Sequence, residues 1–82
     1  MKVNIINSIN EYVVAVNTRE CTKLADRIDK EERFNVTEIR LLWGKNEGYI
    51  YIWPNEEDIN VDLKEELQKI VDAYIEENGL SK

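Results

Sequence analysis

The chain has 82 residues, of which 43% are hydrophobic and 34% are charged, and 17 acidic against 11 basic side chains give a net charge of −6. This length suits one small domain, residues 1–82, and excludes a second domain or a deep cleft. The mixed composition argues against disorder, and a chain with no histidine and one cysteine has too few ligands for a dedicated metal site.

Neither a signal peptide nor a membrane span is indicated by the sequence. The N-terminus lacks an apolar run of signal-peptide length, and no stretch approaches the roughly 20 apolar residues that a spanning helix needs. We therefore expect a cytoplasmic protein with no membrane association. Its lone cysteine, Cys21, cannot form an internal disulfide and is expected to be a small buried apolar residue.

The first part of the chain is predicted to form two strands and a helix. β-Branched runs at residues 2–7 and 12–17, separated by a polar stretch, predict two strands, although the first could instead be a loose arm. Asn17, three residues before Glu20, then marks a helix start close to a capping box. Apolar residues at helical spacing extend this helix over residues 18–33.

The second part repeats this order with different sequences. Strand patterns at residues 36–43 and 49–53 flank a break at residues 44–48, and Pro54 ends the second strand because it cannot donate to a ladder. Asp62, with Glu65 at the third position, predicts the start of a second helix. Gly79 and Leu80 predict a Schellman-type end in which Leu80 touches Ile75.

This order, ββαββα, predicts an α+β two-layer sandwich. A four-stranded antiparallel sheet would be covered on one face by two helices. Its other face must then be exposed to water or to a partner.

The register of the second hairpin determines where its aromatic residues point. Pairing Trp43 with Tyr49 would place Ile39, Leu41, Tyr51 and Trp53 on the same face as these two residues. A slip of one residue moves every side chain of one strand to the opposite face. The residues on the inner face are then Ile39, Leu41, Trp43, Ile50 and Ile52. We favour the second register, which gives Gly48 a positive φ and turns Tyr49, Tyr51 and Trp53 outward, beside Arg40 and Leu42.

We call Tyr49, Tyr51 and Trp53 the aromatic stripe. Rigid aromatic side chains on an open sheet are typical of contact surfaces, and the stripe is therefore a candidate binding site together with Arg40. The alternative is that each ring packs on the N-terminal segment or closes the core. Stacking of nucleic-acid bases is disfavoured because only Arg40 and Lys45 lie nearby.

Acidic residues are concentrated near the C-terminus. Residues 55–78 contain nine acids and two bases, whereas the first 54 residues contain eight of each. From this segment we select an acidic patch of Glu56, Glu57, Asp58, Asp62, Glu65, Asp72 and Glu76. Such a surface repels phosphates and attracts basic partners. The first predicted helix carries a basic stripe instead, Arg19, Lys23, Arg27 and Lys30, which we interpret as an ordinary solvated face.

The sequence gives no indication of catalysis. General bases are usually histidines, of which there are none, and Cys21 is expected to face the core without an adjacent base. Its three glycines form no phosphate-binding loop. We therefore expect a non-enzymatic protein without a cofactor or a metal.

These patterns lead to one main functional hypothesis and two alternatives. The main one is a binding or inhibitory protein that occupies a surface of a basic protein partner through the acidic patch and the aromatic stripe. By analogy of size and charge, it could mimic nucleic acid, as small phage and mobile-element inhibitors do. The alternatives are a homodimer formed through the open aromatic face, and a nucleic-acid accessory protein that uses the basic stripe.

Overall fold

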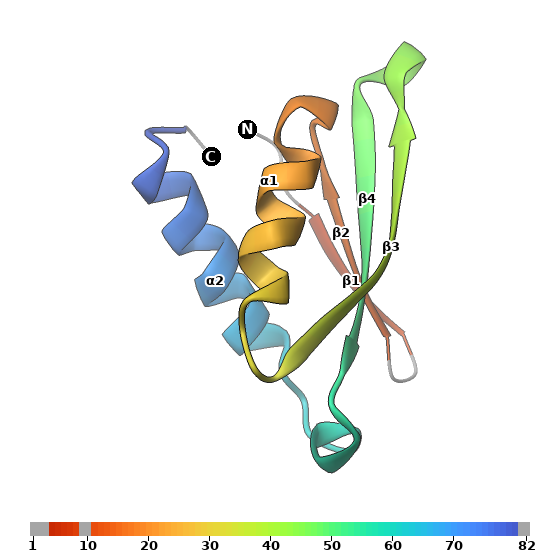
Figure 1. The fold of residues 1–82 in the computed structure, drawn as a ribbon, viewed down its shortest axis with the longest axis vertical. Helices are drawn as coiled ribbons and strands as arrows, with labels where there is room; N and C mark the ends of the chain where they lie inside the picture. Colours follow the sequence, from red (N-terminus) through yellow and green to blue (C-terminus); the bar gives the residue numbers. More distant parts are fainter. Residues whose placement is uncertain (1–3, 9–10, 81–82) are drawn as a thin grey trace.

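Four antiparallel strands form one sheet in the computed structural model, in the spatial order β1-β2-β4-β3, and two helices cover one face of it (Figure 1). The structure describes residues 4–8 and 11–80. The strands are β1 (Asn4–Ser8), β2 (Glu11–Val16), β3 (Phe34–Leu42) and β4 (Glu47–Pro54). The helices are α1 (Thr18–Asp29) and α2 (Lys64–Glu77), with short 3-10 helices η1 (Trp43–Lys45) and η2 (Glu56–Asp58). The predicted α+β fold, with the order ββαββα, is confirmed.

The core lies between the sheet and the two helices. Alternate residues of β2 and β4 are buried on this side, and helix α1 packs against β3, β4 and α2. The largest side chains that are buried completely come from the two central strands, both helices and the residue before α2: Val14, Ile50, Ile52, Leu24, Ile28, Leu63, Leu67 and Val71. Period-2 burial in the strands and helical spacing in the helices therefore meet in a single apolar layer.

The strand pairing of the second hairpin register is confirmed, although Ile39, which was predicted inside, is 37% exposed. Ile39 lies opposite Ile50 and Arg40 lies opposite Tyr49, so the aromatic stripe is on the face away from the helices. A β-bulge between Val36 and Glu38 makes this possible. It shifts the alternation of β3 by one residue, because Val36 opposes Ile52 before the bulge and Ile39 takes the same side after it.

Two details of the predicted turn are wrong. Trp43 does not join the inner group, because β3 ends at Leu42 and Trp43 begins η1, where it is 71% exposed. The residue with positive φ is Asn46, at 53°, rather than Gly48. Asparagine tolerates this left-handed conformation. Gly48 is instead a buried strand residue that lies opposite Val16 in β2 and Leu41 in β3.

The helix ends differ in part from the prediction. α1 ends at Asp29 rather than at residue 33, and Asp29 Oδ1 accepts the backbone N–H of Val36 at 3.2 Å. The predicted capping box at Asn17 is absent, since the Asn17 side chain makes no cap hydrogen bond. Asp62 does accept the N–H of Lys64 at 3.0 Å, where α2 begins.

The predicted Schellman end of α2 is confirmed by its geometry. Gly79 has φ 64°, and its N–H donates to Glu76 O at 3.2 Å. The N–H of Leu80 donates to Ile75 O at 2.9 Å, and the Leu80 side chain packs against the core. Glycine therefore stands where the chain needs a left-handed residue to leave the helix.

Glu20 links the two helices instead of capping α1. Its Oε1 accepts the hydroxyl of Tyr74, which is a buried residue of α2, at 2.6 Å. Burial, and secondly this hydrogen bond, raise the pKa of Tyr74 above its ordinary value. The neutral tyrosine is thus the form that the folded state favours.

This contact predicts a loss of stability at alkaline pH. Because the pKa of Tyr74 is raised by folding, its contribution is complete below the unfolded-state pKa of about 10 and decreases as the pH rises above it. Denaturant unfolding of the wild type and Tyr74→Phe should differ by about 1 kcal/mol at neutral pH, and less above pH ~10. Glu20→Gln should keep most of the pH effect, since burial is its larger cause. A constant difference between wild type and Tyr74→Phe across this range would contradict the assignment.

Candidate functional site

The face of the sheet away from the helices, which we call the open face, carries the aromatic stripe. Tyr49 and Tyr51 are half-buried among their neighbours, and Trp53 is 43% exposed. Each ring interacts with a polar side chain. The Tyr49 hydroxyl donates to Glu47 at 2.6 Å, and the Trp53 indole N–H donates to Glu11 at 2.9 Å. The guanidinium of Arg40 lies over the Tyr51 ring, 5.8 Å from its centroid.

Apolar residues of the two strands beyond the stripe continue this surface. Val13 lies opposite Tyr51 and Ala15 opposite Tyr49 in the β2–β4 register, and Ile6 of β1 lies opposite Val13. Ile6 is 50% exposed, although it is a large aliphatic residue. The open face is therefore an apolar and aromatic surface that extends over three strands, edged by charged side chains.

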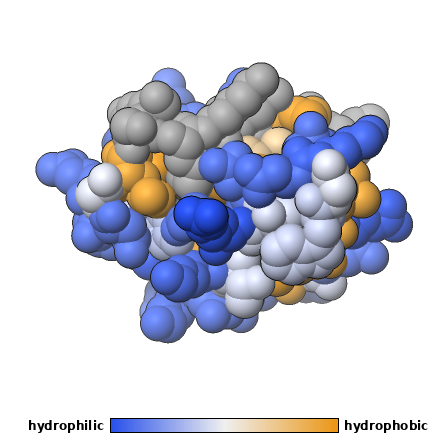
Figure 2. All heavy atoms as spheres, turned by 90° about the horizontal axis from the view of Figure 1, so that it is seen from above, coloured by the Kyte–Doolittle hydropathy of each residue, from blue (hydrophilic) through white to orange (hydrophobic). Residues whose placement is uncertain are grey.

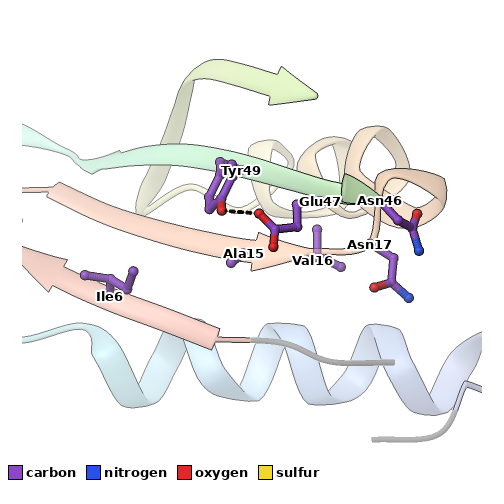
Figure 3. A pocket seen from close by; sticks show the side chains of 7 residues that line it. All are labelled: Ile6, Ala15, Val16, Asn17, Asn46, Glu47 and Tyr49. Atoms are coloured by element: carbon purple, nitrogen blue, oxygen red, sulfur yellow. Dashed lines mark hydrogen bonds between the residues drawn. The ribbon is translucent and has the colours of Figure 1, made fainter. Parts of the chain in front are cut away.

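A pocket of about 240 Å³ lies at one end of the open face, where β2 leads into α1 and β4 begins (Figure 3). Ile6, Ala15 and Val16 contribute its apolar lining. Its polar lining consists of Asn17, Asn46, Glu47 and Tyr49. The hydrogen bond to Glu47 and, to a smaller extent, burial raise the pKa of Tyr49. The phenol therefore stays neutral and can donate its proton to this hydrogen bond.

The acidic patch is divided between two places. Glu56, Glu57 and Asp58 form η2, which follows directly after Trp53, Pro54 and Asn55 at the end of the aromatic stripe. Asp62 lies just before α2, while Glu65, Asp72 and Glu76 are on α2, in the helical layer behind the sheet (Figure 1). The η2 acids therefore follow the stripe in the chain, where Asp58 pairs with Arg33, whereas the α2 acids lie in the helical layer.

Basic residues from the first half of the chain neutralise part of the acidic segment. Arg33 lies 3.1 Å from Asp58 and 3.5 Å from Glu66, and Arg27 lies 2.6 Å from Glu31 and 3.7 Å from Glu77. Among these residues only the Asp58 side chain is mostly buried, and ion pairs between exposed side chains add little stability. Within residues 4–8 and 11–80, Glu56, Glu57, Glu65 and Glu76 are in no ion pair.

One residue of the basic stripe of α1 is neutralised. Arg27 pairs with Glu31, just after α1, and with Glu77 of α2, and three exposed bases remain: Arg19, Lys23 and Lys30. Figure 2 looks down on the end of the molecule that carries the β3–β4 turn, where hydrophilic residues lie next to a pale area of intermediate hydropathy and to small separate hydrophobic areas.

No group of three or more Cys, Asp or Glu residues in the part of the chain that the structure describes could hold a metal ion. Cys21 is completely buried, and burial raises the pKa of its thiol, which keeps it protonated and unreactive. None of the helices in the described ranges is long and apolar enough to cross a membrane.

The sequence did not identify the pocket. Its residues come from β1, β2 and β4 and from Asn17 and Asn46 at the ends of two of these strands, and their meeting depends on β2 lying between β1 and β4. Alternation in β2 does place Val13 and Ala15 on one face, but it does not say which strand lies beside them. Comparison of the chain with known proteins finds no matching family model, no matching curated protein and no matching solved structure.

Proposed function

We propose that this chain is a cytoplasmic, non-enzymatic binding protein that occupies a surface of a basic protein partner. The contact would be made by the open face and by the acidic turn η2 at its end. One observation carries the proposal: three adjacent aromatic side chains lie on a sheet face that no described element covers. By covering a basic groove of its partner, for example one that binds nucleic acid, the protein would act as an inhibitor.

The arrangement of the rings supports such a contact. Aromatic side chains offer a large contact area with few rotatable bonds, and they are frequent among the residues that dominate binding energy. Here Glu11, Glu47 and Arg40 already orient them, so little side-chain freedom remains to be lost on binding.

The two parts of the acidic patch would have different roles. Glu56 and Glu57, which are exposed in the turn that follows the stripe in the chain, would pair with basic groups at the edge of the contact. The acids of α2 lie in the other layer and would attract the partner at a distance, which affects the association rate more than the affinity.

Pull-down of the tagged protein at two salt concentrations tests the proposal. At about 0.1 M salt the wild type should retain a basic protein and release it at about 1 M, where the Debye length falls from about 10 to about 3 Å. Trp53→Ala should lose most of the retained protein, whereas Trp43→Ala removes an exposed tryptophan outside the stripe and should retain it. Glu57→Lys should weaken capture more than Glu76→Lys. Equal capture by all four variants would contradict the proposal.

Self-association through the open face is the second candidate. It is favoured by the large apolar side chains exposed there, since Ile6 is 50% exposed and Trp53 and Leu42 are each 43% exposed. Light scattering on the same samples distinguishes the two functions. A dimer that Trp53→Ala dissociates, without any retained protein, would assign the open face to a second copy of the chain.

A further inference from the structure

Glu47 places a carboxylate in the wall of the pocket at the start of β4. Its Oε2 accepts the Tyr49 hydroxyl at 2.6 Å, and the two side chains point toward one another (Figure 3). No ion pair within the described ranges involves Glu47. Arg40, opposite Tyr49, instead lies 3.4 Å from Glu38, and Lys45 is exposed in η1 without an ion pair to Glu47. The carboxylate is therefore oriented but not neutralised.

Two amide side chains lie at the same end of the pocket. Asn46 is held there by its left-handed backbone and by the hydroxyl of the buried Thr18, which donates to Asn46 Oδ1 at 2.7 Å. Asn17 precedes Thr18 and lines the pocket as well. Each amide has a carbonyl acceptor and an NH2 donor, and the Asn46 oxygen is already used by Thr18. The Asn17 carbonyl and the Glu47 carboxylate are therefore the acceptors that this end of the pocket offers to the N–H groups of a ligand.

The remaining wall is apolar. Ile6 and Ala15 belong to neighbouring strands on the open face, and the small side chain of Ala15 leaves space beside Tyr49, its neighbour across the β2–β4 pair. An arginine or lysine side chain has an apolar stem of three or four methylenes and a charged head that donates hydrogen bonds but accepts none. The apolar wall of the pocket suits the stem, and its polar end suits the head.

We infer that this pocket receives one arginine or lysine side chain of the partner, with the cationic head at Glu47 and Asn17 and the stem against Ile6 and Ala15. The inference rests on the proposed function, because it specifies one contact on the surface assigned to partner binding. The net charge of −6 and the unpaired Glu47 select a cation over an anion or a neutral group.

Single amino-acid probes test the pocket without knowledge of the partner. Nα-acetyl-arginine amide, the matching lysine compound and the neutral citrulline analogue are titrated into the isotope-labelled protein, and backbone amide shifts are followed by NMR. The arginine or lysine probe should give saturable shifts centred on Asn46, Glu47 and Ala15, and citrulline should bind at least about tenfold more weakly, as expected for loss of a charge-assisted hydrogen bond.

Two variants distinguish the effect of the Glu47 charge from the effect of the space beside Ala15. Glu47→Gln should weaken the cationic probes at least about tenfold, and Ala15→Ile, which fills the pocket and keeps all charges, should abolish their localised shifts. Glu32→Gln removes the same charge at an exposed position outside the pocket and outside the proposed contact, and it should bind the probes as the wild type does. Diffuse shifts, equal binding of citrulline, or equal losses in Glu47→Gln and Glu32→Gln would overturn the inference. Failure of partner capture in the pull-down, with probe binding intact, would instead reject only the proposed function.

Discussion

The Gly48→Ala variant is expected to lose about 1–3 kcal/mol of unfolding free energy, as overpacked cores do. A Cβ at this position would lie 2.7 Å from Cβ and 2.8 Å from Sγ of Cys21, closer than side-chain atoms can approach. The backbone cannot easily move away, because Gly48 is paired with strands on both sides. Glycine is therefore needed here for the close approach of β4 to α1. Urea unfolding followed by tryptophan fluorescence measures the loss.

Companion variants show whether the clash is the cause. Gly44→Ala meets no atom within 4 Å and should change stability by less than about 0.5 kcal/mol. Adding Cys21→Ala to Gly48→Ala removes Sγ but leaves the Cβ contact at 2.7 Å, so most of the loss should persist. Adding Cys21→Gly removes both atoms and should recover stability, less the cost of about 1 kcal/mol for a glycine within a helix. If Gly48→Ala is as stable as Gly44→Ala, helix and strand are not in this contact.

The Tyr12→Phe variant should cost about 1–3 kcal/mol, because it leaves a buried donor without a partner. The Tyr12 hydroxyl accepts the N–H of Leu63 at 2.9 Å, immediately before α2, and both residues are almost completely buried. Phenylalanine would keep the edge-to-face contact with Phe34, in which the ring centroids are 6.4 Å apart. The loss of unfolding free energy in this variant therefore reports on the hydrogen bond and not on the packing of the ring.

Hydrogen exchange gives this prediction a local readout. The Leu63 amide should be protected in the wild type and exchange much faster in Tyr12→Phe, since its acceptor is gone. Tyr51→Phe removes a hydroxyl from the open face instead and should change stability by less than about 0.5 kcal/mol. Unchanged protection of Leu63 in Tyr12→Phe would show that another group satisfies this N–H.

The fold could be predicted because the local signals agree with the tertiary structure. Alternation in β2 and β4, helical spacing in α1 and α2, and glycine at the end of α2 each indicate the element that forms. The bulge before Glu38 and the early exit of Trp43 into η1 could not be predicted in the same way. Both depend on how β3 fits against its neighbour, which composition and spacing do not encode.

The candidate site was predicted in part for a similar reason. The outward direction of the aromatic stripe follows from a period of two, once one register is preferred. The division of the acidic patch could not be predicted in this way, because the number of charges along the chain does not show in which layer each residue lies. The pairing of Arg33 with Asp58 joins residues 25 positions apart and depends on where β3 begins relative to η2.

The bulge in β3 also affects how copies of this protein can meet in solution. β3 is an edge strand, and a long regular edge would offer its free backbone groups to a second sheet and allow open-ended fibres to grow. The irregularity at Thr37, whose hydroxyl donates inward to the Tyr51 carbonyl at 3.3 Å, interrupts that ladder near its middle. Strand addition along β3 is thereby opposed, while the apolar and aromatic side chains of the open face stay exposed on the same sheet.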